Sequence, residues 1–152
     1  MNRQWHRHAL VLLVLVATAP QGAWARTLLE AGNSTTWRYL DGGVAPPARW
    51  TQQSFDDSQW KTGTAPLGYG EPRLVTELRK EGANGKQAVT AWFRCEFKPP
   101  KLAAGESLVV STCVDDGAVI YLNGQEACRV NMPRGPVTPK TFASQTLGDS
   151  EE

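Results

Sequence analysis

Two pairs of adjacent carboxylates have the residue types and spacing for chemistry. Asp115 and Asp116 precede Gly117 in DDGAVIYLNG, and Asp56 and Asp57 lie in FDDSQW. Paired acids can serve as general acid and base in hydrolysis, and loop carboxylates can hold calcium. Adjacent side chains diverge, however, and no second acidic cluster is visibly placed opposite either pair. The sequence therefore predicts turns at both places, and it leaves a structural calcium ion at Asp115 and Asp116 as an open alternative.

The first 25 residues have the pattern of a secretory signal. A start that carries Arg3 and Arg7 is followed by the unbroken apolar run 9–17 and by the small residues of A-W-A at 23–25. This order is typical of a removed signal peptide. The apolar run is shorter than the about 20 residues that a membrane-spanning helix needs. We predict cleavage before Arg26 and a secreted or periplasmic protein that no longer contacts the membrane.

The residues after the signal suit one domain, 26–152. Removing the signal takes away two arginines and no acid, so 127 residues remain with 14 basic and 15 acidic side chains and a formal charge of −1. A near-neutral chain of mixed signs gives no electrostatic basis for binding nucleic acid or an anionic membrane.

Histidine and cysteine usage argues against two classes of site. Both histidines, His6 and His8, lie in the signal. Ser-His-Asp and Cys-His catalysis need an imidazole base, and zinc sites usually need histidine or clustered cysteine. Cys95, Cys113 and Cys128 have spacings that match no metal motif, and we interpret them as small apolar side chains in preference to a disulfide. We therefore predict a non-catalytic chain.

The pattern of apolar runs predicts an all-β sandwich, because short runs alternate with clusters of Gly, Pro, Asn and Asp. Proline cannot occupy a central strand, so proline-rich segments are predicted as loops. Residues 73–90 are predicted as a single helical turn or a long surface loop. The predicted strands are 37–40, 91–97, 108–114, 118–122 and 126–130, and the predicted loops are 41–47, 62–72, 98–106 and 132–139.

Asn123-Gly124 is the clearest local signal. A two-residue Asn-Gly link between apolar runs predicts a β-hairpin with a type I′ turn. The register that follows opposes Leu122 to Gln125 and Ile120 to Ala127. Ile120 and Ala127 are therefore expected on the face toward the core, and Tyr121 on the partly wet face.

Aromatic rings are the candidate ligand-binding groups. Sugar-binding surfaces use exposed Trp and Tyr rings as platforms, although most rings in a sandwich fill its core. Trp92 and Phe93 point to opposite faces of one strand, so no more than one of them belongs to the main core. We predict Trp92 and Tyr69 as exposed ligand-binding rings, with Tyr121 as a third.

Several motifs occur in one order: TWRYLDGG, FDDSQW, APLGYG, TAWFRCEF and DDGAVIYLNGQEACRVNMPRGP. Together they resemble the galactose-binding-like jelly-roll modules of secreted bacterial proteins, over nearly all of the chain after the signal. FDDSxW and the strand ending in YLNG also resemble the sugar-binding domain of family 2 glycoside hydrolases. The resemblance implies a two-sheet antiparallel jelly roll without chemistry of its own, which binds carbohydrate in some members and is purely architectural in many.

Such modules often precede a metallophosphoesterase (purple acid phosphatase-like) domain, so the resemblance implies a downstream catalytic domain as a partner. A last apolar strand closes the sandwich in these modules, and this chain ends at LGDSEE, where that segment would begin. We therefore expect a jelly roll without its closing strand, which leaves an open edge. The first hypothesis is an accessory module that binds carbohydrate or is architectural, and the second is the N-terminal part of a secreted hydrolase.

Overall fold

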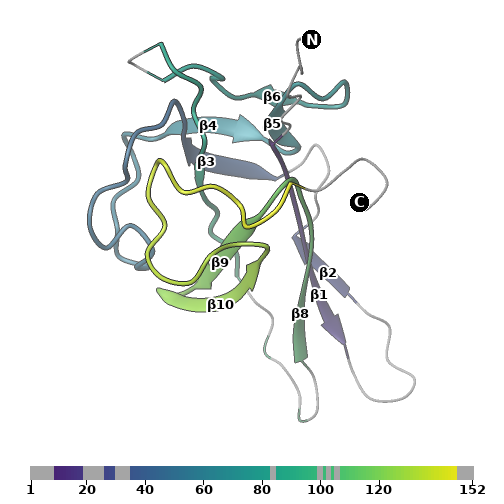
Figure 1. Ribbon diagram of the computed structural model, residues 1–152. Helices are drawn as coiled ribbons and strands as arrows, with labels where there is room; N and C mark the ends of the chain where they lie inside the picture. The colour runs from purple at the N-terminus through teal and green to yellow at the C-terminus, as the bar shows by residue number, and fades with distance from the viewer. Residues whose placement is uncertain are drawn as a thin grey trace.

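The computed structural model describes residues 9–18, 26–29, 35–82, 85–98, 101, 104 and 107–146. Over these residues the chain is all-β, as predicted, and contains no helix of the length and apolarity needed to cross a membrane (Figure 1). The strands are β1 (Ala9–Thr18), β2 (Arg26–Leu29), β3 (Thr36–Leu40), β4 (Lys61–Thr64), β5 (Leu67–Tyr69), β6 (Thr76–Glu77), β7 (Trp92–Arg94), β8 (Ser107–Val114), β9 (Ala118–Leu122) and β10 (Gln125–Val130).

The described strands form two sheets and a separate hairpin. The larger sheet has the order β2-β1-β5-β6, with β8 also paired to β1, and the smaller has the order β4-β3-β7. β9 and β10 form the hairpin. Figure 1 shows β3 and β4 above the hairpin, with β1 and β8 running down beside it. All the pairs are antiparallel except β5 with β6, an arrangement consistent with a β-sandwich.

β1 lies within the segment that the sequence predicts as a signal. It pairs with β8 from Val11–Val114 to Thr18–Ser107 along one edge, and with β5 and β2 along the other. Cleavage before Arg26 would remove a strand to which three others pair. Processing of residues 1–25 stays a prediction.

The loop predicted at 62–72 was wrong, because it contains most of β4 and all of β5. Proline is excluded from pairing only at its own position, and Pro66 lies between the two strands. Leu67, the first residue of β5, is 1% exposed. The helical turn considered for 73–90 was also wrong, since the parallel strand β6 and a bridge between Glu81 and Gln87 lie there.

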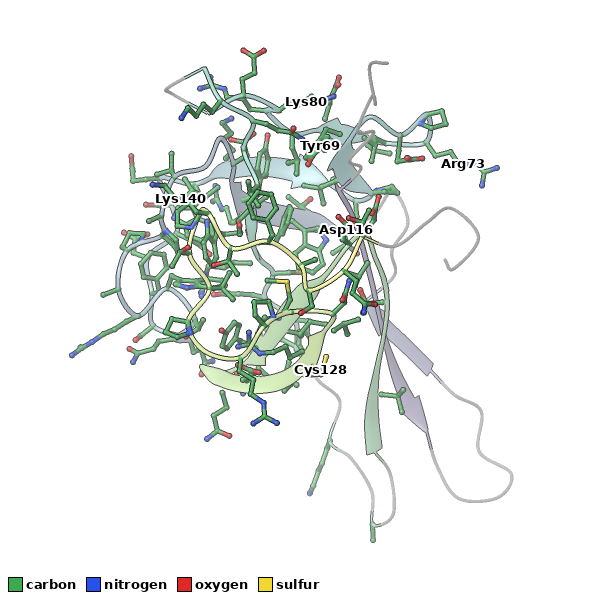
Figure 2. The ribbon with its side chains drawn as sticks, in the orientation of Figure 1. Tyr69, Arg73, Lys80, Asp116, Cys128 and Lys140 are labelled. Carbon is green, nitrogen blue, oxygen red and sulfur yellow. The ribbon has the colours of Figure 1, made fainter. Side chains whose placement is uncertain are left out.

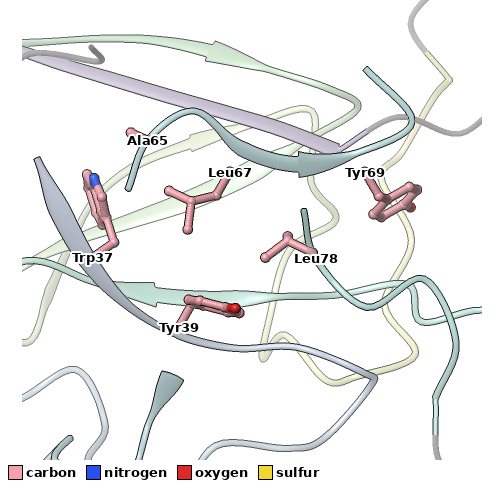
Figure 3. Close-up of a cluster of buried hydrophobic side chains, with 6 residues drawn as sticks. All are labelled: Trp37, Tyr39, Ala65, Leu67, Tyr69 and Leu78. Carbon is pink, nitrogen blue, oxygen red and sulfur yellow. The ribbon is translucent and has the colours of Figure 1, made fainter. Parts of the chain in front are cut away.

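The main core lies between β3 and β5. Alternation along β3 places Trp37 and Tyr39 on one face, and Phe93 of β7, which is paired with Tyr39, packs against the same cluster. Figure 3 shows this cluster, whose members are Trp37, Tyr39, Ala65, Leu67, Tyr69 and Leu78.

Gly63 is required where β4 passes β6. A Cβ at position 63 would lie 2.6 Å from Cγ2 and 2.8 Å from Oγ1 of Thr76, and 3.0 Å from Cε1 of Tyr39. The Thr76 hydroxyl is fixed, because it accepts from the Thr64 N–H and donates to the Thr64 carbonyl, both at 2.8 Å. We expect Gly63→Ala to lower the free energy of unfolding by about 1 to 3 kcal/mol, measured by urea denaturation. In a Thr76→Ala background this cost should shrink, and an unchanged cost would contradict the steric explanation.

The hairpin confirms the predicted turn and corrects the register. Asn123 and Gly124 have φ of 49° and 84°, as a type I′ turn requires, and Leu122 opposes Gln125. A bulge between Glu126 and Cys128 then makes Ile120 oppose Cys128 instead of Ala127. Because one extra residue reverses the faces of the strand beyond it, Ala127 is exposed and does not face the core as predicted.

Candidate functional site

A cavity of about 620 Å³ lies beside β7 and β9. Its walls come from residues 90–98 around β7, from 117–123 around β9, and from single side chains that include Trp37 and Trp50. This volume is within the range of cavities that hold small ligands, about 300 to 1,000 Å³. The cavity is therefore the candidate binding site among the described residues.

Trp50 is the centre of an aromatic wall. Its ring is stacked on that of Trp60, with centroids 6.1 Å apart and planes inclined by 27°. It meets the rings of Trp92 and Tyr121 edge to face, at centroid distances of 5.3 and 5.6 Å. The Trp92 indole N–H donates to the Val44 carbonyl at 2.9 Å, which fixes the ring. Two of the three predicted ligand-binding residues, Trp92 and Tyr121, are thus brought together through a third ring.

Arg94 holds in place the segment that carries Trp50. Its Nε donates to Oδ2 of Asp57 at 2.7 Å, and its Nη1 donates to the Trp50 carbonyl and, at 3.2 Å, to the Gln52 carbonyl. The guanidinium also lies over the Phe55 ring, 5.3 Å from its centroid. The Arg94 and Asp57 side chains are only 10% and 20% exposed, so the ion pair is less screened than a surface pair.

Both acids of FDDSQW have structural partners. Oδ1 of Asp56 accepts from the Ser58 backbone N–H at 2.9 Å, and this hydrogen bond lowers the pKa of Asp56. Asp57 uses its carboxylate for the ion pair and its carbonyl for the Trp60 N–H, at 2.9 Å. The rings of Phe55 and Trp60 meet with centroids 5.8 Å apart. The turn predicted at this motif is therefore present, and the contact between the two rings anchors it.

Asp115–Gly117 connect β8 to β9, as the turn prediction requires. The Asn131 side-chain amide donates to the carbonyls of Asp116 and Gln145, at 2.9 and 2.7 Å, and ties this turn to the end of β10. Among the described residues, no three His, Cys, Asp or Glu side chains gather into a group that could hold a metal ion. The calcium site at Asp115 and Asp116 stays a prediction.

The predicted exposure of Trp92 and Tyr69 was wrong. Trp92 is 6% exposed and Tyr69 is 9% exposed. Strand alternation separates Trp92 from Phe93 as expected, but Trp50 covers the face of β7 that was assigned to solvent. Tyr69 belongs to the main core and is not part of the cavity wall; Figure 2 shows it in the upper part of the view, above Cys128 on the hairpin.

The sequence analysis did not identify the roles of Trp50 and Arg94. Trp50 follows the proline-rich segment 41–47, and no regular spacing of apolar residues around it predicts that its side chain is buried. Arg94 shares a face with Trp92 by strand alternation. One signal could have indicated a shielded ion pair. The arginine lies two residues from a tryptophan on the same strand, and the aspartates at 56 and 57 are available as its partners.

Cys95 and Cys128 are free thiols that should differ in reactivity. Cys95 is half-buried, and burial raises its pKa, whereas Cys128 is exposed on β10. Because the thiolate is the reactive form, we expect iodoacetamide at pH 8 to label Cys128 about tenfold faster or more. The rate at Cys95 should keep rising with pH beyond about 8.5, the ordinary thiol pKa. Peptide mass spectrometry assigns the labelled cysteines. Equal labelling rates at Cys95 and Cys128 in the folded protein would contradict this expectation. In the control, the protein unfolded in urea, the two rates should be equal.

No protein-family model, curated protein or solved structure matches the chain. The resemblance to galactose-binding-like modules therefore stays a hypothesis based on motifs, and the geometry of the cavity carries the functional argument.

Proposed function

We propose that this chain is a secreted, non-catalytic binding module that holds a carbohydrate in the cavity beside β7 and β9. The observation that carries the proposal is the convergence of the Trp50, Trp92 and Tyr121 rings on a cavity of ligand size. The C–H face of a pyranose packs on aromatic rings, and its hydroxyl groups need polar partners.

Polar side chains for those hydroxyl groups line the same cavity. Thr90, Glu96 and Asn123 lie in its wall beside the aromatic residues, and together they offer both donors and acceptors. A mostly apolar cavity with a few convergent polar groups is the usual form of a small-molecule site. The jelly-roll resemblance supports the same proposal, since some galactose-binding-like modules bind carbohydrate.

Binding of the full chain to a glycan array tests the proposal. We expect Tyr121→Ala to weaken binding of the recognised glycan by about tenfold or more, equivalent to about 1.4 kcal/mol, while Tyr121→Phe retains most of the affinity because it keeps the ring. Phe142→Ala is the matched control, since Phe142 is 51% exposed and is not part of the cavity wall. Circular dichroism confirms that each variant is folded. Absence of binding to every glycan would overturn the proposal.

A further inference from the structure

The cavity extends around the edges of two strands. Every residue from 90 to 98 and every residue from 117 to 123 lines it. Successive side chains of a strand point to opposite faces, and on β7 Phe93 packs against the main core while Trp92 meets Trp50 on the other side. The cavity therefore reaches both faces of β7 and both faces of β9. It can do so only by passing around an edge of each strand.

The edges that border the cavity are those without a partner strand. Over the described residues, β7 pairs with β3 alone and β9 pairs with β10 alone, so β3 and β10 cover the other two edges. The edges on the cavity thus present rows of backbone N–H and C=O groups that no described strand pairs. Such a row is a template for a further strand, and here two of them border one cavity.

We propose that the cavity accepts an extended, apolar segment of a partner protein, which adds as a strand between β7 and β9. The backbone of a strand offers N–H and C=O groups along both of its sides, so it complements two unpaired edges at once. The added strand would continue both the β4-β3-β7 sheet and the hairpin. Its alternate side chains would face the main core on one side and Trp50 and Tyr121 on the other. Strands buried on both faces are nearly continuous apolar runs, so we expect a segment rich in Val and Ile.

A partner protein is favoured over a second copy of this chain. The longest apolar runs among the described strands belong to β1 and β8, and these two are already paired with each other. The ligand class goes beyond the proposed carbohydrate. Because the two ligands would use one cavity, each should displace the other.

A synthetic peptide tests strand addition. Fluorescence polarisation follows the titration of the full chain into fluorescein-labelled KVIVTVIK, whose terminal lysines limit its aggregation. We expect saturable binding, and binding of KVIVPVIK that is about tenfold weaker or more, because proline lacks the backbone donor that a central strand needs. Absence of binding, or equal binding of the two peptides, would overturn the proposal.

A charge placed in the cavity wall should block the added strand. Ile120 lines the cavity on β9 and is half-buried. We expect Ile120→Lys to weaken binding of KVIVTVIK about tenfold or more, because an unpaired charge would be buried. Val130→Lys is the matched control, since Val130 lies on β10 of the same hairpin, is 37% exposed and is not part of the cavity wall. Circular dichroism confirms that both variants are folded, and equal effects of the two would overturn the proposal.

Hydrogen exchange of the wild-type chain depends on no variant. Saturating KVIVTVIK should slow amide exchange in both 90–98 and 117–123 and leave that of 125–130 unchanged. Protection of one segment alone, or of neither, would overturn a strand between two edges. Protection that rises with protein concentration when no peptide is present would assign the cavity to a second copy and overturn the choice of a partner.

Failure of this proposal is distinguishable from failure of the proposed function. A chain that binds a glycan but not KVIVTVIK would overturn strand addition and leave the carbohydrate proposal standing. A chain that binds the peptide and no glycan would do the reverse.

Discussion

Replacing Arg94 by alanine is expected to lower the free energy of unfolding by about 3 kcal/mol, near the lower end of the cost of removing one partner of a buried ion pair. The change leaves the Asp57 carboxylate without the cation at 2.7 Å. It also leaves the carbonyls of Trp50 and Gln52 without this donor. The 20% exposure of Asp57 lets water compensate in part. Urea denaturation followed by tryptophan fluorescence measures the effect.

Arg38→Ala is the matched control, because Arg38 faces the same carboxylate from 3.8 Å with a side chain that is 41% exposed. Exposed ion pairs contribute about 0 to 1 kcal/mol, so this variant should remain close to wild type. Arg94→Lys keeps the charge but not the planar fork, and we expect a stability between wild type and Arg94→Ala. Equal losses in Arg38→Ala and Arg94→Ala would refute the shielded role of Arg94.

Truncation of Trp50 to alanine is expected to cost about 3 kcal/mol of stability, as for other large aromatic truncations, and to abolish ligand binding. The ring contacts Trp60, Trp92 and Tyr121, so its removal takes the central contact from the aromatic wall. Thermal unfolding gives the stability, and near-UV circular dichroism should lose intensity as the remaining rings gain freedom.

Trp50→Phe keeps an aromatic ring at this position but makes it smaller, so it tests whether the size of the ring matters. It should retain more than half of the stability lost in Trp50→Ala and part of the binding, because a smaller ring still meets Trp92. Phe142→Ala should change the stability by no more than about 0.5 kcal/mol, as is usual for surface substitutions. A Trp50→Ala chain with wild-type stability and binding would show that the aromatic wall does not form the site.

Local signals predicted those parts of the fold that depend on local conformation. Asn123-Gly124 specifies its turn through positive φ at two positions, and the predicted strand 37–40 covers all of β3 except its first residue. β5 was missed because Pro66 and Gly70 make its three residues resemble a turn. Its extended form depends on pairing with β1 and β6, which are distant partners that propensity does not reveal.

Only part of the candidate site was predicted, again because local signals do not reveal contacts between distant segments. Alternation correctly separated Trp92 from Phe93, but it could not show that a distant segment carrying Trp50 covers the second face of β7. The register error at Ala127 has a similar origin, because QEACRV contains no Gly or Pro that marks a bulge. Long-range packing decides burial at these positions, and a single sequence records it weakly.

If residues 1–25 act as a signal, as the sequence predicts, the position of β1 would link folding to export. In the folded chain these ten residues pair along both edges, to β8 on one side and to β5 and β2 on the other. If they act as a signal, the targeting machinery must capture them before the sheet forms, so the two processes compete for one segment. Slow folding of the precursor would favour translocation. In a chain that folds first, the signal residues would already be paired in the sheet and would no longer be accessible to the targeting machinery.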